Sequence, residues 1–240
     1  MNKPEICILI PVWKRPEILT YCIKGLANLY KVYDNFFVTF ILSRDDCRYT
    51  QNYVKIHSEI KYLFAFNYIV LDSNYPVSQK MNQAIKELNL LSWDYLMNLG
   101  SDNVLNPDIF SIYQPYFNKK VPYFGLKSAY FINYYTKKVK KSTLDIEKLI
   151  FGAGRMISRD IIEQCNYSIY PIEQNQGLDT ASAIIIEQKT GKTPVSVYST
   201  KPMILDIKSD TNINLWEILN SYPNCIDTEI DIKKYFKVKI

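Results

Sequence analysis

Residues that could carry chemistry gather in the stretch 93–105, which reads WDYLMNLGSDNVL. An apolar strand there runs into a small acidic tip, where Gly100 lets the backbone approach a ligand closely or take a left-handed conformation. Asp102 then lies exposed at the strand end. A carboxylate in such a place suits a hard divalent cation, which takes one or two carboxylates together with diphosphate oxygens. A plain turn is the alternative, because Gly, Ser, Asp and Asn all form turns.

The composition excludes several other kinds of site. The chain has one histidine, and its five cysteines are never spaced as CxxC, so we expect no histidine metal cluster, Ser-His-Asp triad, zinc site or disulfide framework. The net charge of +5 suits an anionic small molecule as well as nucleic acid. No apolar run reaches the ~18 residues of a membrane span, and no signal peptide is indicated. We therefore expect a cytoplasmic protein.

Strands and helices alternate along the first hundred residues. Short apolar runs predict strands, and apolar residues at helical spacing predict helices. The strands are expected at 6–12, 36–42, 68–71 and 93–105, and the helices at 17–30, 50–63 and 78–91. This order is typical of a parallel α/β sheet wound by right-handed crossovers. Ligands bind such sheets beyond the carboxyl ends of the strands, where the polar tips WKRP, SRDD, DSN and GSDN fall.

The second half is less regular. The aromatic residues of 123–135 and the basic run 137–141 predict a hairpin, and FGAGRMISRDIIEQC predicts a turn, a strand and a helix. A helix from about Asp179 to Gly191 and the strand PVSVYST follow, and then a loop and a last helix. The stretch 129–142 also fits nucleic acid, because aromatic rings stack on bases and lysines neutralise phosphates. The hairpin is favoured, because aromatic residues are common in strands.

Several of these segments, taken in order, resemble a known family. The segments ILIPVWKRPEIL, the strand ending in SRDD, SQKMNQAIKEL and WDYLMNLGSDNVL resemble the nucleotide-binding half of a GT-A glycosyltransferase, closest to its family 2-like branch. FGAGRMISRDIIEQC and GLDTASAIIIEQKTGKTPVSVYS are similar to that family's acceptor segment and acidic motif. The resemblance implies one GT-A domain over 1–240, a Rossmann-like, mixed, mostly parallel α/β sheet flanked by helices. Residues 1–110 would then bind the nucleotide sugar, and residues 111–240 the acceptor.

The resemblance also implies the residues that bind the donor. A proline-containing loop after the first strand packs on the base, and an acidic residue after the second strand binds the base or ribose. A helix with an asparagine near its start and a DxD-type metal site complete the set. Lysines could add positive charge at the leaving diphosphate. The matching residues are Pro11, Trp13, Arg15, Asp45, Asp46, Lys80, Asn82, Ser101, Asp102 and Asn103, with Lys208 as a further lysine.

The metal motif departs from the family pattern. Gly100 stands where the family has its first aspartate, so Asp102 would hold Mn²⁺ or Mg²⁺ with help from Asn103. Asp206 is a candidate further ligand, because it follows the last predicted strand.

On the acceptor side, the resemblance implies that Asp179 is the catalytic base of an inverting reaction, although Leu178 replaces the usual glutamate. Asp179 at a helix start could equally be an N-cap. Gly152, Gly154, Arg155 and Gly177 are expected near the acceptor.

The expected function is therefore transfer of a sugar from a nucleotide sugar, with a UDP-sugar favoured, to a hydroxyl group. The acceptor is left open among a glycan, a lipid-linked sugar, a protein and a nucleic-acid base. One alternative is a non-catalytic module of the same fold that binds sugar or nucleic acid, which the missing first aspartate favours. Another is a transferase that acts on modified DNA bases. The location would be host cytoplasm if the source is a phage or virus.

Overall fold

Seven strands form the main sheet of the computed structural model, which describes residues 3–60, 63–146, 148–212, 216–221 and 224–240. Their order is β10-β6-β9-β4-β1-β2-β3. They are β1 (Ile6–Pro11), β2 (Phe36–Ser43), β3 (Phe66–Leu71), β4 (Tyr95–Asn98), β6 (Tyr123–Leu126), β9 (Arg155–Ser158) and β10 (Val195–Val197). β9 runs antiparallel to β4 and β6, and the other neighbours are parallel, so the predicted mixed, mostly parallel sheet is confirmed.

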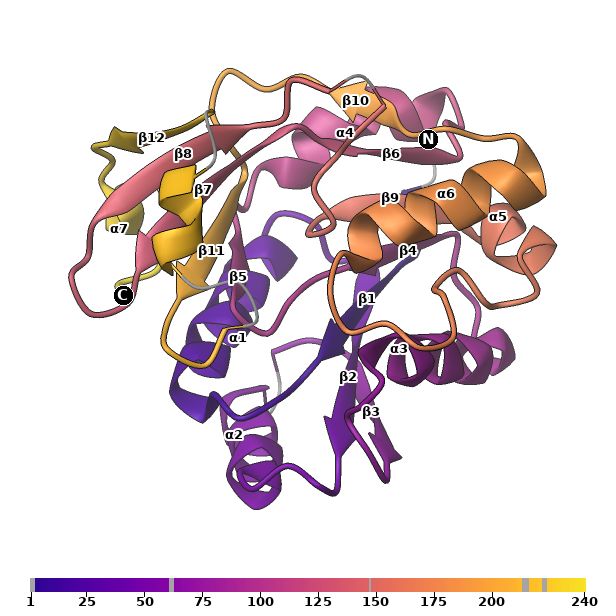
Figure 1. Cartoon of the computed structure of the whole chain (residues 1–240), viewed down its shortest axis with the longest axis horizontal. Helices are drawn as coiled ribbons and strands as arrows, with labels where there is room; N and C mark the ends of the chain where they lie inside the picture. Colours follow the sequence, from indigo (N-terminus) through magenta and orange to yellow (C-terminus); the bar gives the residue numbers. More distant parts are fainter. Residues whose placement is uncertain (1–2, 61–62, 147, 213–215, 222–223) are drawn as a thin grey trace.

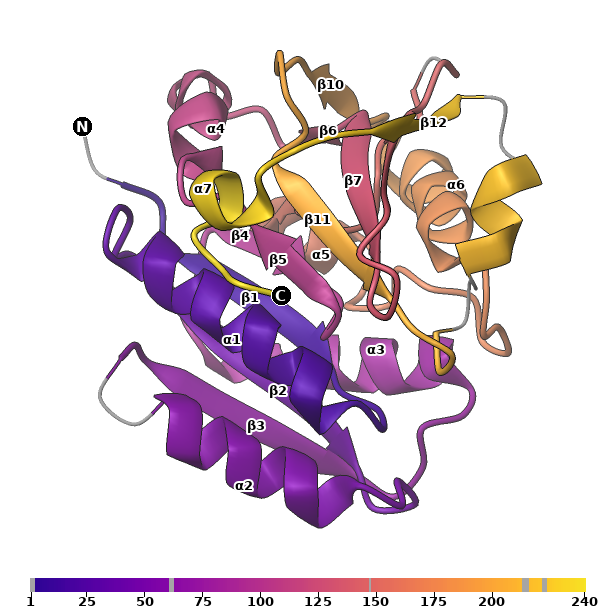
Figure 2. The same cartoon turned by 90° about the vertical axis from the view of Figure 1, so that its left-hand side faces the viewer.

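A second sheet lies beside the main one, at the left in Figure 1. Its order is β12-β8-β7-β11-β5, with β5 (Asn103–Leu105), β7 (Ser128–Asn133), β8 (Val139–Thr143), β11 (Ile204–Lys208) and β12 (Cys225–Thr228). β5 packs closely on α1 (Pro16–Tyr30), as Figure 2 shows. Gly25 of α1 makes this approach possible, because a Cβ there would come within 2.8 Å of the Val104 side chain.

Helices cover both faces of the main sheet. The other α-helices are α2 (Tyr49–Ile60), α3 (Val77–Glu87), α4 (Ile109–Asn118), α5 (Arg159–Gln164), α6 (Leu178–Thr190) and α7 (Ile232–Phe236), and Leu88–Leu90 and Trp216–Ser221 form 3₁₀ helices. Along β1, Ile6, Ile8 and Ile10 pack with α1, whereas Cys7 and Leu9 pack with α3 and α5. β1 is therefore buried on both faces, which explains its unbroken apolar sequence. None of the helices in the described ranges has the length and apolar character to cross a membrane.

Three sequence predictions of secondary structure need correction. The stretch 93–105 is two strands in different sheets, because a turn at residues 100–102 separates β4 from β5. Residues 204–208, expected in a loop, form β11 between β5 and β7. The expected 123–135 arm of the hairpin is split between β6 of the main sheet and β7 of the second, and only β7 pairs with β8. The end of the helix predicted at 50–63 lies partly outside the described residues.

Candidate active site

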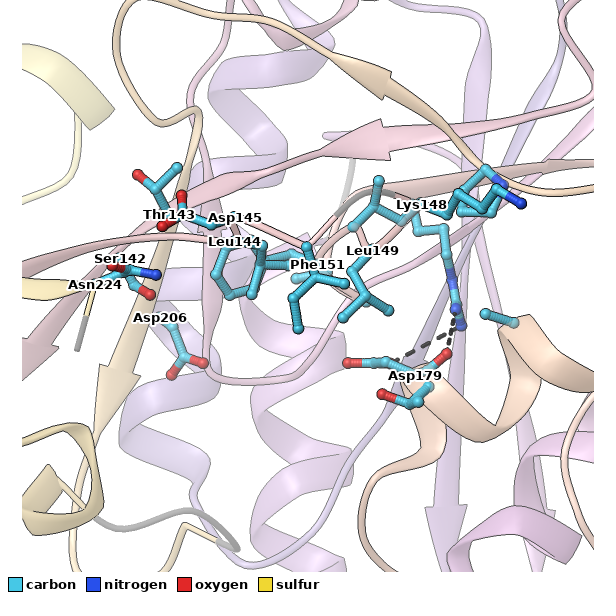
Figure 3. Close-up of a pocket in the computed structure, with 18 of the residues that line it drawn as sticks. Ser142, Thr143, Leu144, Asp145, Lys148, Leu149, Phe151, Asp179, Asp206 and Asn224 are labelled. Carbon is cyan, nitrogen blue, oxygen red and sulfur yellow. Dashed lines mark hydrogen bonds and ion pairs between the residues drawn. The ribbon is translucent and has the colours of Figure 1, made fainter. Parts of the chain in front are cut away.

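A cleft of about 550 Å³ opens between β11 of the second sheet and the helix α6. Asp206 lies on one side of this cleft and Asp179 on the other, as Figure 3 shows. Leu149 and Phe151 form part of the wall between them. Carboxylates from distant parts of the sequence thus face one cavity.

Asp102 lies close to the Asp206 side of the cleft, and its carboxylate is firmly held. Its Oδ2 atom accepts hydrogen bonds from Arg15 Nη1 at 2.7 Å and from Asn212 Nδ2 at 2.6 Å. Burial would raise the pKa of Asp102, but the Arg15 guanidinium and the Lys208 ammonium lower it below its ordinary value. Asp102 is therefore ionised at neutral pH.

Asp206 supplies a second carboxylate beside Asp102. β11 pairs antiparallel with β5, so that Asp206 lies opposite Asn103. Lys208 Nζ donates to Asp206 Oδ2 at 2.9 Å, whereas Oδ1 is buried without a hydrogen-bond partner among the described residues. Burial raises the pKa of Asp206 to about 6, with Lys208 opposing the shift and Asp102 adding to it.

These two carboxylates fit a divalent cation that binds together with a diphosphate. Arg15 fixes Oδ2 of Asp102, and Lys208 fixes Oδ2 of Asp206. Oδ1 of Asp206, which has no hydrogen-bond partner among the described residues, is an oxygen suited to a hard metal ion. Across the part of the chain that the structure describes, no group of three or more His, Cys, Asp or Glu side chains could hold a metal. The remaining ligands would have to come from phosphate oxygens and water, as is usual for Mg²⁺.

Gly100 is explained by the side chains that fold back over it. Its N–H donates to Asn103 Oδ1 at 2.8 Å. A Cβ at position 100 would lie 2.7 Å from this oxygen and would collide with Asp102 Oδ1. Of the two roles expected for Gly100, the left-handed conformation is wrong, because Gly100 is not among the glycines with positive φ, and the close approach of the backbone to a ligand stays a prediction. Asn103 thus stabilises the turn through its side-chain oxygen, and the neighbouring Ser101 is buried.

The two aspartates after β2 have different environments. Asp46 is buried and accepts hydrogen bonds from the backbone N–H groups of Lys14, at 2.8 Å, and Arg48, at 2.9 Å, so it ties together the loops after β1 and β2. Asp45 is exposed and accepts from Ser73 Oγ at 3.0 Å. Of the two, Asp45 is the one whose side chain lies at the surface where a ligand could reach it.

Aromatic side chains lie near Asp45. Trp13, in the loop after Pro11, packs edge-on against Tyr75, with ring centroids 5.7 Å apart. Tyr75 is exposed and follows Ser73 and Asn74, both of which donate to Asp45. Neither Ser73 nor Tyr75 was among the residues predicted to bind the donor, although Ser73 lies in the polar tip DSN after β3.

Lys80 and Asn82 of α3 are both buried. Lys80 is buried, and its Nζ donates to Val12 O at 3.1 Å and to Asn74 Oδ1 at 2.8 Å. Burial, opposed by Asp46 and Asp45, lowers the pKa of Lys80 to about 7. Asn82 binds the backbone of Tyr170 in both directions, as donor at 2.9 Å and acceptor at 3.0 Å. Both side chains therefore bind loops of the chain itself, and we propose this role for them in place of the expected contact with the donor.

The acceptor-side residues divide into two groups. Gly152, Arg155 and Asp179 line the cleft, whereas Gly154 and Gly177 take left-handed backbone conformations, with φ of +72° and +64°, and do not line it. Gly177 is the N-cap residue of α6, and Asp179 follows it in the first turn. The interpretation of Asp179 as an N-cap is therefore wrong.

The comparisons with known proteins concern the fold. No protein-family model matches the sequence, and no curated protein matches it. The chain is similar to S. aureus TarS in complex with UDP-GlcNAc, with a TM-score of 0.59, 13% identity, and coverage of 87% of this chain and 60% of that chain. It is similar to the mannosyltransferase PcManGT from Pyrobaculum calidifontis in complex with GDP-Man and Mn²⁺, with a TM-score of 0.60, 10% identity, and coverage of 91% and 60%. The chain has the GT-A fold.

The fold predicted by resemblance is thus confirmed, and this chain spans about 60% of the length of each of these two structures. In this GT-A fold, the cleft lies near the carboxyl end of β4, because Arg155, which lines it, pairs with Asn98 at that end; ligands bind α/β sheets at such strand ends. Asn212, which holds Asp102, was missed by the sequence analysis. Its only sequence signal is the polar run SDTN after β11.

Proposed function

We propose that this protein is an inverting glycosyltransferase that moves a sugar from a nucleotide sugar to an acceptor hydroxyl group. The observation that carries the proposal is the cleft, which has Asp179 on one side and Asp206 with Lys208 on the other. Asp102, held by Arg15, lies close behind Asp206. The carboxylate of Asp179 suits a general base, and the charges of the opposite side suit binding of a diphosphate. The GT-A fold of TarS and of the mannosyltransferase supports this proposal.

The diphosphate of the donor would bind beside Arg15 and Lys208. Asp102 and Asp206 would hold Mn²⁺ or Mg²⁺ there, through the oxygens that Arg15 and Lys208 leave free. When bound, the cation neutralises charge on the departing diphosphate. This cluster draws on both parts of the chain, since Arg15 and Asp102 precede residue 110 and the other two follow it. We therefore propose a narrower division of the chain. Residues 1–110 would bind the nucleobase of the donor, residues 111–240 would bind the acceptor, and both parts would bind the diphosphate.

The base of the donor would bind at the ends of β1, β2 and β3. Asp45 offers carboxylate oxygens to a base or ribose, and Trp13 and Tyr75 offer apolar ring surface. We favour uracil, and the complex of TarS with UDP-GlcNAc supports this choice.

The reaction itself requires one proton transfer. The acceptor oxygen attacks the anomeric carbon, the bond from this carbon to the diphosphate oxygen breaks, and the electron pair leaves with the diphosphate. Asp179 takes the proton of the acceptor hydroxyl as general base, a role worth ~10²–10⁴ in rate. Attack from the side opposite the leaving group inverts the anomeric configuration. The five free cysteines are consistent with the cytoplasmic location, which forms part of the proposal.

A thermal-shift screen tests the donor class. UDP, GDP, CDP and their sugars are added with and without Mn²⁺, because a ligand at ~100 times its Kd stabilises the folded state by about 2.7 kcal/mol. We expect UDP and a UDP-sugar to raise the melting temperature, and Mn²⁺ to increase the shift.

Two matched variants locate the effect. Asp102→Asn is expected to lose the Mn²⁺-dependent part of the shift. Asp34→Asn removes the same charge from an exposed side chain that precedes β2, at the opposite end of the strand from the proposed site, and is expected to behave as the wild type. A wild-type protein that binds no nucleotide and releases none from any nucleotide sugar would refute the proposal, and binding of an oligonucleotide by such a protein would favour the non-catalytic module.

A further inference from the structure

Arg155, the first residue of β9, is a charged side chain in the protein interior. Its side chain is 1% exposed. Nη1 donates to Tyr123 Oη at 3.2 Å and to the backbone carbonyl of Asp179 at 3.0 Å. Nε and Nη2 are buried and have no hydrogen-bond partner among the described residues. A buried guanidinium is costly unless an opposite charge lies near it.

The carboxylate of Asp179 is the opposite charge at this place. Arg155 Nη2 lies 3.9 Å from Asp179 Oδ1, and the Asp179 side chain is 59% exposed. Burial would lower the pKa of Arg155, but Tyr123, Tyr170 and Asp179 raise it above its ordinary value. One member of the pair is thus fixed in the interior, and the other projects into the cleft.

Gly152 completes the seat of this carboxylate. A Cβ at position 152 would overlap all three atoms of the Asp179 carboxyl group. The segment Gly152–Arg155 therefore contacts Asp179 at two points. The carboxyl group lies against the backbone of Gly152, and the guanidinium of Arg155 supplies the opposite charge. The carbonyl contact of Arg155 also holds the first turn of α6, which carries Asp179.

We infer that Arg155 is a positioning residue, which holds the Asp179 carboxylate in the orientation that accepts the acceptor proton. The inference rests on the proposed function. Arg155 Nη2 attracts the carboxylate, Nη1 binds the Asp179 backbone carbonyl, and the absence of a side chain at Gly152 leaves the space that the carboxylate occupies. Arg155 does not contact the donor in this account, so its loss is expected to lower kcat and to leave donor binding unchanged.

The test uses hydrolysis of UDP-GlcNAc, in which water serves as the acceptor. Water attacks the anomeric carbon, Asp179 takes its proton, and UDP leaves with the electron pair, so released UDP measures the step. If GDP-mannose is the donor that binds in the thermal-shift screen, it replaces UDP-GlcNAc. The donor Kd is measured by calorimetry on the same proteins.

The variants separate charge from shape. Arg155→Gln can still donate to the Asp179 carbonyl but lacks the charge, and we expect kcat to fall about 10- to 100-fold, part of the general-base effect of ~10²–10⁴. Arg155→Lys keeps the positive charge but loses the planar set of guanidinium donors, so we expect a smaller fall in kcat than for Arg155→Gln. Tyr123→Phe removes the other hydrogen bond of Nη1 and is expected to stay within about threefold of the wild type.

A double-mutant cycle with Asp179→Asn decides the case. If Arg155 acts through the Asp179 carboxylate, Arg155→Gln and Arg155→Lys cause no further loss of kcat in the Asp179→Asn background. Equal losses in both backgrounds, a donor Kd that weakens as much as kcat falls, or an unchanged kcat would each overturn the inference. If Arg155→Gln does not fold, Arg155→Lys, which keeps a buried positive charge, replaces it in the same double-mutant cycle. A wild-type protein that neither binds nor hydrolyses any nucleotide sugar would refute the proposed function instead.

Discussion

Replacing Lys80 by methionine is expected to change how the stability of the protein depends on pH. Lys80 is 2% exposed, and burial lowers its pKa from 10.5 to about 7. Its Nζ binds the backbone of Val12 and the side chain of Asn74, in the loops that would hold the donor base. Methionine has a similar volume and no charge, so the variant removes the titration and leaves the packing nearly intact.

The direction and size follow from proton binding. Between pH ~7 and ~10.5 the unfolded chain keeps a proton on Lys80 that the folded protein has released, so the free energy of unfolding rises with pH. The slope is about 1.4 kcal/mol per pH unit, since one pKa unit corresponds to 1.36 kcal/mol. Below pH ~7 both states are protonated, and the full cost of the buried charge is present.

Urea unfolding at pH 7.5, 8.5 and 9.5 measures this slope, at values chosen to lie roughly within the window above. The difference between the wild type and Lys80→Met is the readout, because the other titrating groups cancel in it. That difference should grow in favour of the wild type by about 1.4 kcal/mol for each pH unit. Lys86→Met, on the exposed side of the same helix, should leave the slope of the wild type unchanged. A flat difference for Lys80→Met would show that Lys80 keeps its proton in the folded protein and would refute the reasoning.

Three further changes test the site. Gly152→Ala should lower kcat at least tenfold, because its Cβ displaces the Asp179 carboxylate, while circular dichroism melts stay close to the wild type. Asn82→Ala should lower the free energy of unfolding by about 2 kcal/mol through its lost backbone bonds, and calorimetry should find the donor Kd unchanged. Asn212→Ala should weaken binding of the Mn²⁺–UDP complex about tenfold, because one of the two donors that hold Asp102 is lost.

Much of the main sheet could be predicted because its signals are local. β1 is apolar throughout since helices cover both of its faces, and the turns after β1, β2 and β3 contain the polar residues that end strands. Asp102 could be named for the same reason, since it stands at the end of an element, whereas Asp179 was named from the order of the motifs that resemble the family. Lys80 and Asn82 could not be judged in this way, because only the folded structure shows that loops from elsewhere bury them.

The second sheet was harder to predict because its strands pair over long distances. β11 has five residues, and its neighbour β5 has three and lies about a hundred positions earlier. Neither is long enough to show a periodic pattern of its own. The turn at Gly100 that separates β4 from β5 is equally hidden, since its residues also fit the end of one continuous strand.

The same long-range pairing brings a second carboxylate to the proposed metal site, where the chain lacks the first aspartate of the motif that it resembles. The sequence motif itself holds one acidic residue, Asp102, because Gly100 stands where the resembled family has a carboxylate, and Asp206 could be named only as a candidate from its place after the last predicted strand. In the folded chain, the antiparallel register of β11 and β5 places Asp206 opposite Asn103, directly after the turn, and brings a second carboxylate to Asp102. A side chain at position 100 would collide with Asp102, so glycine preserves the orientation of the carboxylate that remains. A two-carboxylate cluster is thus assembled in space although the sequence motif holds only half of it, and Arg15 and Lys208 offset its charge.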